Sequence, residues 1–324
     1  MTIVIFGGAG FVGLNIAQWL LGHGHAVTLF DRAGLPATAQ QSLAPHAARL
    51  RVLRGDVTDH AAVEAAIGEG CDALVLGAAI TAGPARDAAE PEHILAVNLM
   101  AQIPMLEAAR RAKVRRVINL SSAAAYGASG QHLPLLEEST ACNPQTLYAI
   151  SKFASERVAA RLAELWQTDV VSVRLSGVFG AFEQPGGVRD TPSPQGMIID
   201  CLARGVPALL SDPGMRDWVY ATDVAEAVAL LIEADKPRHA LYNISSGAAF
   251  TAEAWGRAFA ALRPGFVCRL AGVGETPTVT VHGPTRAPLS VARLADEFGW
   301  RARFDCEASA ADMNRWLRDH RNGA

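Results

Sequence analysis

The chain has 324 residues, of which 50% are hydrophobic and 19% are charged, and its formal net charge is −3. This near-neutral balance lacks the basic surface that a nucleic-acid-binding protein needs, so we expect a small-molecule ligand. No run of about 18 apolar residues predicts a membrane span, and the first residues lack the pattern of a signal peptide. The five cysteines are scattered without a C-x-x-C pair, so we expect a reducing cytoplasm, no disulfides and no metal site.

Short β-branched runs alternate with segments of helical periodicity through the first half of the chain. The predicted strands cover 2–6, 26–30, 50–53, 72–76, 116–120 and 170–174. The predicted helices cover 11–22, 59–68, 92–112 and 146–167. Strands separated by helices indicate right-handed crossovers, and therefore an α/β fold whose parallel sheet is covered by helices on both faces.

The pattern changes in the second half of the chain. Segments 181–196 and 263–288 are rich in Pro, Gly and Thr, which is typical of loops. Between them lie a predicted helix, 222–234, and a predicted strand, 241–244. We therefore expect a smaller, loop-rich lobe, with some of its regular elements returning to the main sheet.

A glycine-rich turn with the sequence GGAGFVG, residues 7–13, joins the first predicted strand to the first predicted helix. Its spaced glycines let the chain turn tightly, bring its backbone against a pyrophosphate and pack helix on strand. The N-terminus of the helix then supplies N–H donors and the positive end of a dipole. The residues of this turn predicted to bind a dinucleotide are Gly7, Gly10, Phe11, Val12 and Gly13.

An acidic residue, Asp31, ends the second predicted strand, which is the context that this glycine motif requires. Its carboxylate is expected to accept hydrogen bonds from the adenosine ribose and to repel a 2′-phosphate, so NAD is favoured over NADP. Arg32 beside it weakens this preference, because an arginine at that place can accommodate the phosphate.

A tyrosine and a lysine four residues apart, Tyr148 and Lys152, share one face of a predicted helix. A tyrosine pKa near 10 must fall to about 7 for acid–base work, which takes about 4 kcal/mol. One positive charge at about 4 Å supplies energy of that order at an effective dielectric constant of about 20. The pair therefore predicts a proton-transferring tyrosine, and Ser121 and Ser122 follow the strand predicted just before it.

With these features the sequence resembles the extended short-chain dehydrogenase/reductases of the NAD-dependent epimerase/dehydratase family. The resemblance spans nearly the whole chain, and its motifs follow in the family's order and spacing. They are the glycine motif at 7–13, Asp31, Asp56-Val57, Gly77-Ala78-Ala79, Asn98, Ser121-Ser122, Tyr126-Gly127, Tyr148, Lys152, Arg216-Asp217 and Gly299-Trp300.

The resemblance implies a role for each matching residue. Tyr148 would exchange the substrate proton, Lys152 would lower the pKa of Tyr148 and hold the nicotinamide ribose, and Ser122 would hydrogen-bond the reacting oxygen. The further residues implied to contact NAD are Asp31, Arg32, Asp56, Val57, Gly77, Ala78, Ala79 and Asn98. For Asn98, a local hydrogen bond within its helix is an equal alternative.

The sequence departs from the family's dehydratases and decarboxylases after the catalytic serine. Ala123 and Ala124 stand where those subgroups carry the acidic residues for a second proton transfer. Elimination of water needs that additional acid and base, so hydride chemistry alone is expected. The reaction would be net oxidation or reduction of a carbinol, or transient oxidation followed by return of hydride to the opposite face.

The substrate-binding residues also depart from those of nucleotide-sugar members. Ser176 stands where those enzymes carry an asparagine, while Arg216 keeps the place of one phosphate-binding arginine. The second such arginine has no clear counterpart, and Arg286 lies several residues out of register. A diphosphate with about two charges needs more fixed donors, so we expect a smaller substrate. Arg189, in an unusual loop, could reach a carboxylate or lie in solvent.

These observations support three hypotheses. The first is an NAD-dependent oxidoreductase that acts on a secondary hydroxyl of a small sugar, sugar acid or other polyhydroxy substrate. The second is a UDP-sugar 4-epimerase with tightly held NAD, and the third is a dinucleotide-binding regulator without catalysis. The resemblance also implies a homodimer formed through the helices at 92–112 and 146–167.

The expected fold has two units. Residues 1–175 would form an NAD-binding Rossmann-type domain, a doubly wound parallel sheet to which 217–247 returns. The smaller C-terminal lobe, formed by 176–216 and 248–324, would bind the substrate.

Overall fold

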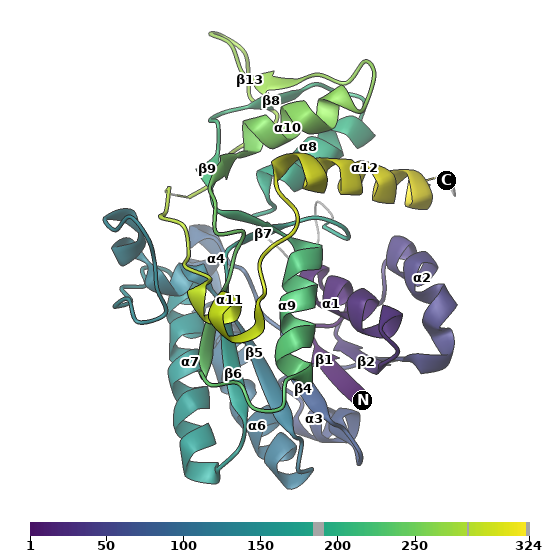
Figure 1. Ribbon diagram of the computed structural model, residues 1–324, viewed down its shortest axis with the longest axis vertical. Coiled ribbons are helices and arrows are strands. Elements are labelled where there is room, and N and C mark those ends of the chain that lie inside the picture. The colour runs from purple at the N-terminus through teal and green to yellow at the C-terminus, as the bar shows by residue number, and fades with distance from the viewer. Residues whose placement is uncertain (184–190, 284, 322–324) are drawn as a thin grey trace.

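The computed structural model describes residues 1–183, 191–283 and 285–321 (Figure 1). At its centre is a seven-stranded parallel sheet with the strand order β11-β6-β5-β4-β1-β2-β3. The strands are β1 (Thr2–Phe6), β2 (Ala26–Asp31), β3 (Leu50–Arg54), β4 (Ala73–Leu76), β5 (Arg116–Ser122), β6 (Val170–Leu175) and β11 (Leu241–Ile244). The order reverses between β1 and β4, which is where a doubly wound sheet binds its ligand. The predicted Rossmann-type fold is confirmed.

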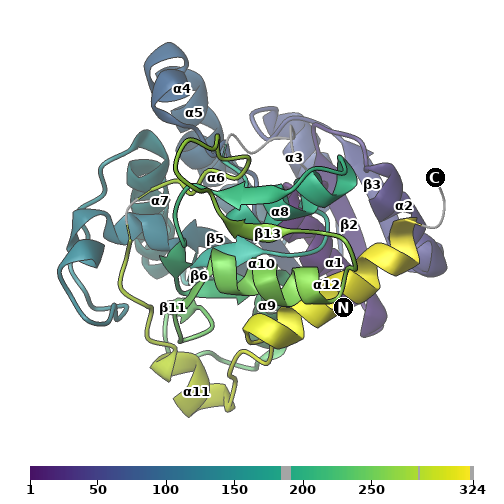
Figure 2. The same cartoon turned by 90° about the horizontal axis from the view of Figure 1, so that it is seen from above.

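Helices cover both faces of the sheet (Figures 1 and 2). On one face lie α1 (Phe11–Gly22) and α9 (Ala221–Glu233), and on the other lie α3 (His60–Ile67), α6 (Gln102–Arg111) and α7 (Leu147–Trp166). Successive side chains of a strand point to opposite faces of the sheet. Ile3 and Ile5 of β1 pack in the core under α1 and α9. Val4 and Phe6 of the same strand join the core under the other three helices. Strands buried on both faces therefore need mainly apolar residues, as the sequences of β1 (TIVIF) and β4 (ALVL) show.

The segment predicted to be helical over 92–112 is helical in the structure, but a π-helical turn divides it into two α-helices. Between α5 (Pro91–Leu95) and α6 the chain makes a π-helical turn, Ala96–Met100. Asn98 in this turn is fully buried, and its side chain binds the backbone of Ile80 on both sides, at 2.7 Å to the N–H and 3.0 Å to the carbonyl oxygen. These bonds stabilise a turn that helical periodicity alone does not reveal.

The C-terminal half contains more regular structure than the sequence predicts. Its larger elements are α8 (Pro194–Ala203), α10 (Ala252–Ala261), α12 (Cys306–Arg321), β8 (Ala208–Leu210) and β13 (Cys268–Leu270). They lie over the edge of the sheet where the strands end, and they surround a separate apolar core (Figures 1 and 2). In that core the rings of Trp255 and Phe259 stack with centroids 5.2 Å apart.

The remaining elements are short and lie in the connections. They are α2 (Ala37–Leu43), η1 (Ala44–Arg49), α4 (Pro84–Ala89), η3 (Ala123–Tyr126), η4 (Ala128–Gln131), β7 (Gly177–Phe179), β9 (Met215–Arg216), β10 (Trp218–Tyr220), β12 (Phe250–Thr251) and α11 (Ala292–Phe298). Three of them matter for the site, because η3 and η4 follow strand β5 and β7 follows strand β6.

A fully buried arginine, Arg116, begins β5 at the amino edge of the sheet. Its guanidinium donates to Leu231 O at 2.8 Å and to Asp235 O at 2.9 Å, and it pairs with Asp169 at 2.6 Å. The last carbonyl groups of a helix have no partner within the helix, so this guanidinium caps the C-terminus of α9.

We predict that Arg116→Met lowers the free energy of unfolding by about 3 kcal/mol, because buried carbonyl oxygens lose their donors. Urea unfolding measures the loss. Arg51→Met is the control: Arg51 is exposed on the edge strand β3, and its replacement should change the free energy by less than about 0.5 kcal/mol. Equal losses in the two variants would contradict the capping role.

Candidate active site

Two loops meet where the order of the sheet reverses, one after β1 and one after β4. Gly7 has a φ of +78°, and a Cβ there would lie 2.6 Å from Ala78 N, so only glycine fits. A Cβ at Gly13 would collide with the carbonyl oxygen of Gly7, so this glycine lets α1 start close to the strand. The first turn of α1 contains no acidic residue. No negative side chain therefore opposes the positive end of this helix, which begins directly after the glycine turn, as a pyrophosphate site requires.

Asp31 ends β2 beside the glycine turn. Its carboxylate accepts the Ala9 N–H at 3.0 Å and the Ala33 N–H at 2.9 Å. The side chain is half-buried, and it joins the glycine turn to the loop after β2. We propose that Asp31 borders the space for an adenosine ribose, because an acidic residue at the end of the second strand has that role in Rossmann-type sheets.

The other predicted dinucleotide residues follow β3 and β4. The pKa of Asp56 is lowered, chiefly because its carboxylate accepts the Thr58 N–H at 2.9 Å and the Thr58 hydroxyl at 2.7 Å, and further by the charge of Arg32. Val57 is buried in the core under α3. Residues 77–79 are half-buried at the end of β4. All these residues lie at the carboxyl edge of the sheet, where the crevice opens.

Asn98 is placed differently from the other predicted dinucleotide residues. Besides its bonds to Ile80, the Asn98 amide donates to Ser151 Oγ at 3.2 Å, and that hydroxyl donates to Tyr148 O at 2.9 Å. Both amide hydrogens are therefore used within the protein. We propose that Asn98 is a positioning residue, which connects the loop after β4 to the helix that carries Tyr148.

Lys152 lies at the centre of the predicted triad. Its ammonium donates to Leu120 O at 2.7 Å and lies 5.9 Å from the centre of the Tyr148 ring. Burial lowers the pKa of Lys152 to about 8, and the negative charge of Glu156 opposes that shift. Tyr148 is in the first turn of α7, where the helix dipole also favours a negative phenolate.

Ser122 is the last residue of β5, two residues beyond the carbonyl that Lys152 contacts. Its Oγ accepts the Ala124 N–H at 3.1 Å and caps the short helix η3. The hydroxyl hydrogen of Ser122 can therefore point to a substrate oxygen. Since β5 packs against α7, the three residues predicted to be catalytic lie on two contacting elements.

A buried ion pair lies beside Lys152. Glu156, one turn further along α7, pairs with Arg174 of β6 at 2.6 Å, and it also accepts the hydroxyl of Ser121. Arg174 in turn lies 4.5 Å from the centre of the Tyr126 ring. Glu156 is not among the residues predicted from the sequence, although its spacing of four residues from Lys152 places the two on one helix face.

Besides Ser122, three residues are predicted to bind substrate, and two of them lie in the described part of the chain. Ser176 is buried, and its hydroxyl donates to Asp217, whose backbone and carboxylate oxygens both lie at 2.5 Å. That hydroxyl is therefore engaged within the protein. Arg216 donates to His282 O at 3.0 Å. Arg189 lies outside the described residues.

Arg286, which the sequence pattern leaves without a role, lies beside Gly130 in the loop after β5. Its side chain is 16% exposed and pairs with Asp217 at 3.8 Å. Burial lowers the pKa of Arg286, while the charges of Asp217, Tyr126 and Tyr148 act in the opposite direction. No local motif could have predicted this position, because a loop from the C-terminal half carries the side chain there.

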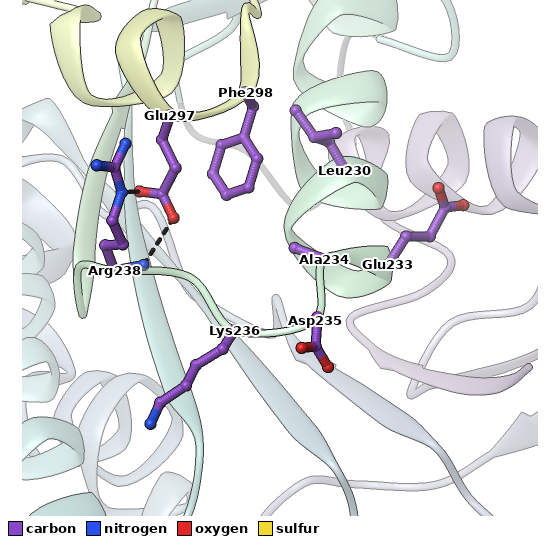
Figure 3. Close-up of a pocket in the computed structure, with 8 residues that line it drawn as sticks. All are labelled: Leu230, Glu233, Ala234, Asp235, Lys236, Arg238, Glu297 and Phe298. Carbon is purple, nitrogen blue, oxygen red and sulfur yellow. Dashed lines mark hydrogen bonds and ion pairs between the residues drawn. The ribbon is translucent and has the colours of Figure 1, made fainter.

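A cavity of about 580 Å³ lies at the opposite edge of the sheet, between the end of α9 and α11 (Figure 3). Glu297 accepts the Arg238 N–H there at 2.7 Å, while Phe298 and Leu230 point toward one another. The loop that lines this cavity precedes β11, so the cavity lies at the amino ends of the strands. It is remote from the triad and is not part of the candidate active site.

Several known proteins are similar to this chain. UDP-glucose 4-epimerase of Corynebacterium glutamicum is 27% identical over 258 residues, which cover 76% of each chain. D-erythronate dehydrogenase of Cupriavidus necator is 36% identical over 163 residues, which cover 48% of each chain. UDP-glucose 4-epimerase from Stenotrophomonas maltophila, solved with NAD and formylated UDP-arabinopyranose, superposes with a TM-score of 0.84 over 100% of both chains at 22% identity.

The fold and these similarities define an NAD-dependent enzyme of the short-chain dehydrogenase/reductase type. The chain belongs to the NAD dependent epimerase/dehydratase family, whose sequence model matches residues 3–245. The predicted cofactor and the predicted enzyme class are confirmed, and the hypothesis of a regulator without catalysis is set aside. Among the helices described, none is both long enough and apolar enough to cross a membrane.

We predict that Glu156→Gln moves the alkaline limb of the kcat/KM pH profile to lower pH. Without the negative charge, the pKa of Lys152 falls further below about 8, so the ammonium loses its proton earlier as pH rises. Glu164→Gln, at an exposed position of the same helix, should leave the profile unchanged. A Glu156→Gln profile that is lower at every pH but not displaced would contradict this role.

We also predict that kcat/KM is higher with NAD than with NADP, because the carboxylate of Asp31 repels a 2′-phosphate. Asp31→Ser should reduce that ratio, since it removes the repulsion and leaves Arg32 in place. Asp319→Ser, at an exposed position on α12, is the control and should keep the ratio. A wild-type enzyme that is more efficient with NADP would refute the assignment.

Proposed function

We propose that this enzyme uses NAD to oxidise or reduce a secondary hydroxyl of a small sugar, sugar acid or other polyhydroxy compound. The observation that carries the proposal is the buried ammonium of Lys152, between Leu120 O and the Tyr148 ring. A positive charge in that place stabilises a phenolate, which is the base that removal of a hydroxyl proton requires. D-erythronate dehydrogenase, a relative by sequence, is named for a sugar acid of this kind.

Each residue of the proposed triad would have its own role in the reaction. In the oxidation direction Tyr148 takes the hydroxyl proton, and Ser122 donates a hydrogen bond to the oxygen as negative charge develops. Lys152 keeps a positive charge beside Tyr148 throughout. Bound NAD would supply the hydride acceptor for the carbon that carries this oxygen. In the reduction direction the proton returns from Tyr148 to the substrate oxygen.

Two alanines after the serine support hydride chemistry alone. Ala123 is buried, and neither Ala123 nor Ala124 can supply the acid and base that elimination of water needs. We further propose that the C-terminal lobe, 176–216 and 248–324, shapes the substrate pocket. The homodimer implied by the family resemblance stays a prediction.

A UDP-sugar 4-epimerase is the second candidate, and the UDP-glucose 4-epimerases among the relatives favour it. Such an enzyme needs the same tyrosine and lysine and holds NAD tightly without net reduction. The engagement of the Ser176 hydroxyl with Asp217 weighs against it, because that position then offers no donor to a diphosphate.

A panel of substrates distinguishes the two candidates. Sugars and sugar acids are incubated with enzyme and NAD, and NADH is followed by its absorbance. UDP-glucose is incubated in parallel, and the sugar products are separated and identified. Formation of NADH with a sugar or sugar acid supports the oxidoreductase, whereas an epimer without accumulated NADH supports the epimerase.

We predict that Tyr148→Phe abolishes turnover of whichever substrate the panel identifies, because the proton acceptor is lost. Binding of NAD, measured by calorimetry, should persist, since the glycine turn and Asp31 are unchanged. Tyr242→Phe, at a tyrosine on β11 that pairs with Glu297, should retain turnover. Turnover by Tyr148→Phe at the wild-type rate would refute the assignment.

A further inference from the structure

The segment that carries Arg286 is joined by backbone hydrogen bonds to the loop after β5. The Ala287 N–H donates to Gly130 O at 2.9 Å. The Leu136 N–H donates to Pro288 O, also at 2.9 Å. Gly130 leaves the space that the side chain needs, because a Cβ there would lie 2.7 Å from Arg286 Cγ. The C-terminal half of the chain thus delivers a guanidinium to the strand end that carries the proposed catalytic serine.

The guanidinium of Arg286 is largely buried and incompletely paired. Within the described residues its one ion-pair partner is Asp217, at 3.8 Å, which is longer than a hydrogen bond. Its Nε is buried and has no hydrogen-bond partner in the same part of the chain. Tyr148 lies near enough for its charge to affect Arg286. A buried donor without a hydrogen-bond partner is unfavourable, so binding of a ligand that accepts a hydrogen bond from it would be favourable.

Asp217 already has its own donors and needs little from Arg286. Its carboxylate is fully buried and accepts the hydroxyls of Ser176 and Ser245, at 2.5 and 2.9 Å. It also accepts the Leu289 N–H at 2.9 Å. The Asp217 charge therefore offsets that of Arg286 only in part, and the N–H groups of the guanidinium are left for another acceptor.

We propose that Arg286 binds a carboxylate of the substrate, so that the preferred substrate is a small hydroxy acid. This inference rests on the proposed role of Tyr148, which would act on the hydroxyl of the same molecule. The planar guanidinium matches the two oxygens of a carboxylate, and charge-assisted bonds of this kind are strong in a buried place. A diphosphate is less suited, because it would bring about two negative charges toward the buried carboxylate of Asp217.

Binding to the Tyr148→Phe enzyme loaded with NAD tests the inference without turnover. The probes are D-erythronate, D-gluconate and D-glucuronate, each compared with its uncharged amide, and UDP-glucose; calorimetry measures each Kd. We expect at least one acid to bind about 10-fold or more tightly than its amide. Adding Arg286→Gln should remove this difference and leave binding of the amide within about twofold. Adding Arg301→Gln, at an exposed arginine of the same lobe, should change neither.

A second variant distinguishes loss of carboxylate binding from loss of the folded structure. Arg286→Lys keeps the charge and loses the planar pair of donors, so it should retain only part of the preference for the acid. Thermal unfolding of both variants should resemble that of the parent, since Asp217 keeps its three other donors.

Three results would overturn the inference. In the first, none of the acids binds more tightly than its amide. In the second, Arg286→Gln weakens binding of the acid and of the amide equally. In the third, the enzyme binds UDP-glucose but none of the acids. Failure of the proposed function is a separate result: the otherwise wild-type enzyme would turn over none of the sugars and acids, or Tyr148→Phe would keep its activity.

Discussion

The buried ammonium of Lys152 constrains how the strands and the helix around it pack. A charge removed from water costs several kcal/mol unless hydrogen bonds and an opposite charge compensate it. The carbonyl oxygen of Leu120 supplies the hydrogen bond, and Glu156, held in turn by Arg174, supplies the charge. Strand β5, helix α7 and strand β6 each contribute one of these groups. Their packing is therefore fixed as much by this electrostatic requirement as by apolar contact.

A second cluster of charges, around Asp217, has a similar arrangement where we propose that the substrate binds. The carboxylate of Asp217 is buried as the Lys152 ammonium is, and hydroxyl and backbone donors compensate it. Arg286 pairs with this carboxylate, and the charges of Asp217 and Tyr148 both raise the pKa of its guanidinium, against the effect of burial. The Lys152 cluster would prepare Tyr148 as the proposed proton acceptor, and the Asp217 cluster would select the substrate.

The parts of the molecule that depend on local sequence patterns could be predicted from the sequence. The parallel strands, the glycine turn and the Tyr148–Lys152 pair all follow from short-range spacing, and the structure places them in one sheet, one crevice and one helix face. The π-helical turn at Asn98 could not be predicted, because it depends on a contact with Ile80 eighteen residues away. The position of Arg286 depends on a loop pairing across more than 150 residues of chain, between Ala287 and Gly130.

The donors of Asp217 come from three separate stretches of the chain. Ser176 follows strand β6, Ser245 follows strand β11, and Leu289 lies in the segment that leads back from the C-terminal lobe. Although the lobe has an apolar core of its own, a single carboxylate thus joins it to two strands of the sheet. The two halves are expected to unfold in one cooperative transition, because separating them would expose the buried Asp217 carboxylate and break its hydrogen bonds. Changes of substrate preference would then have to arise within a rigid frame, by exchange of side chains more than by movement of domains.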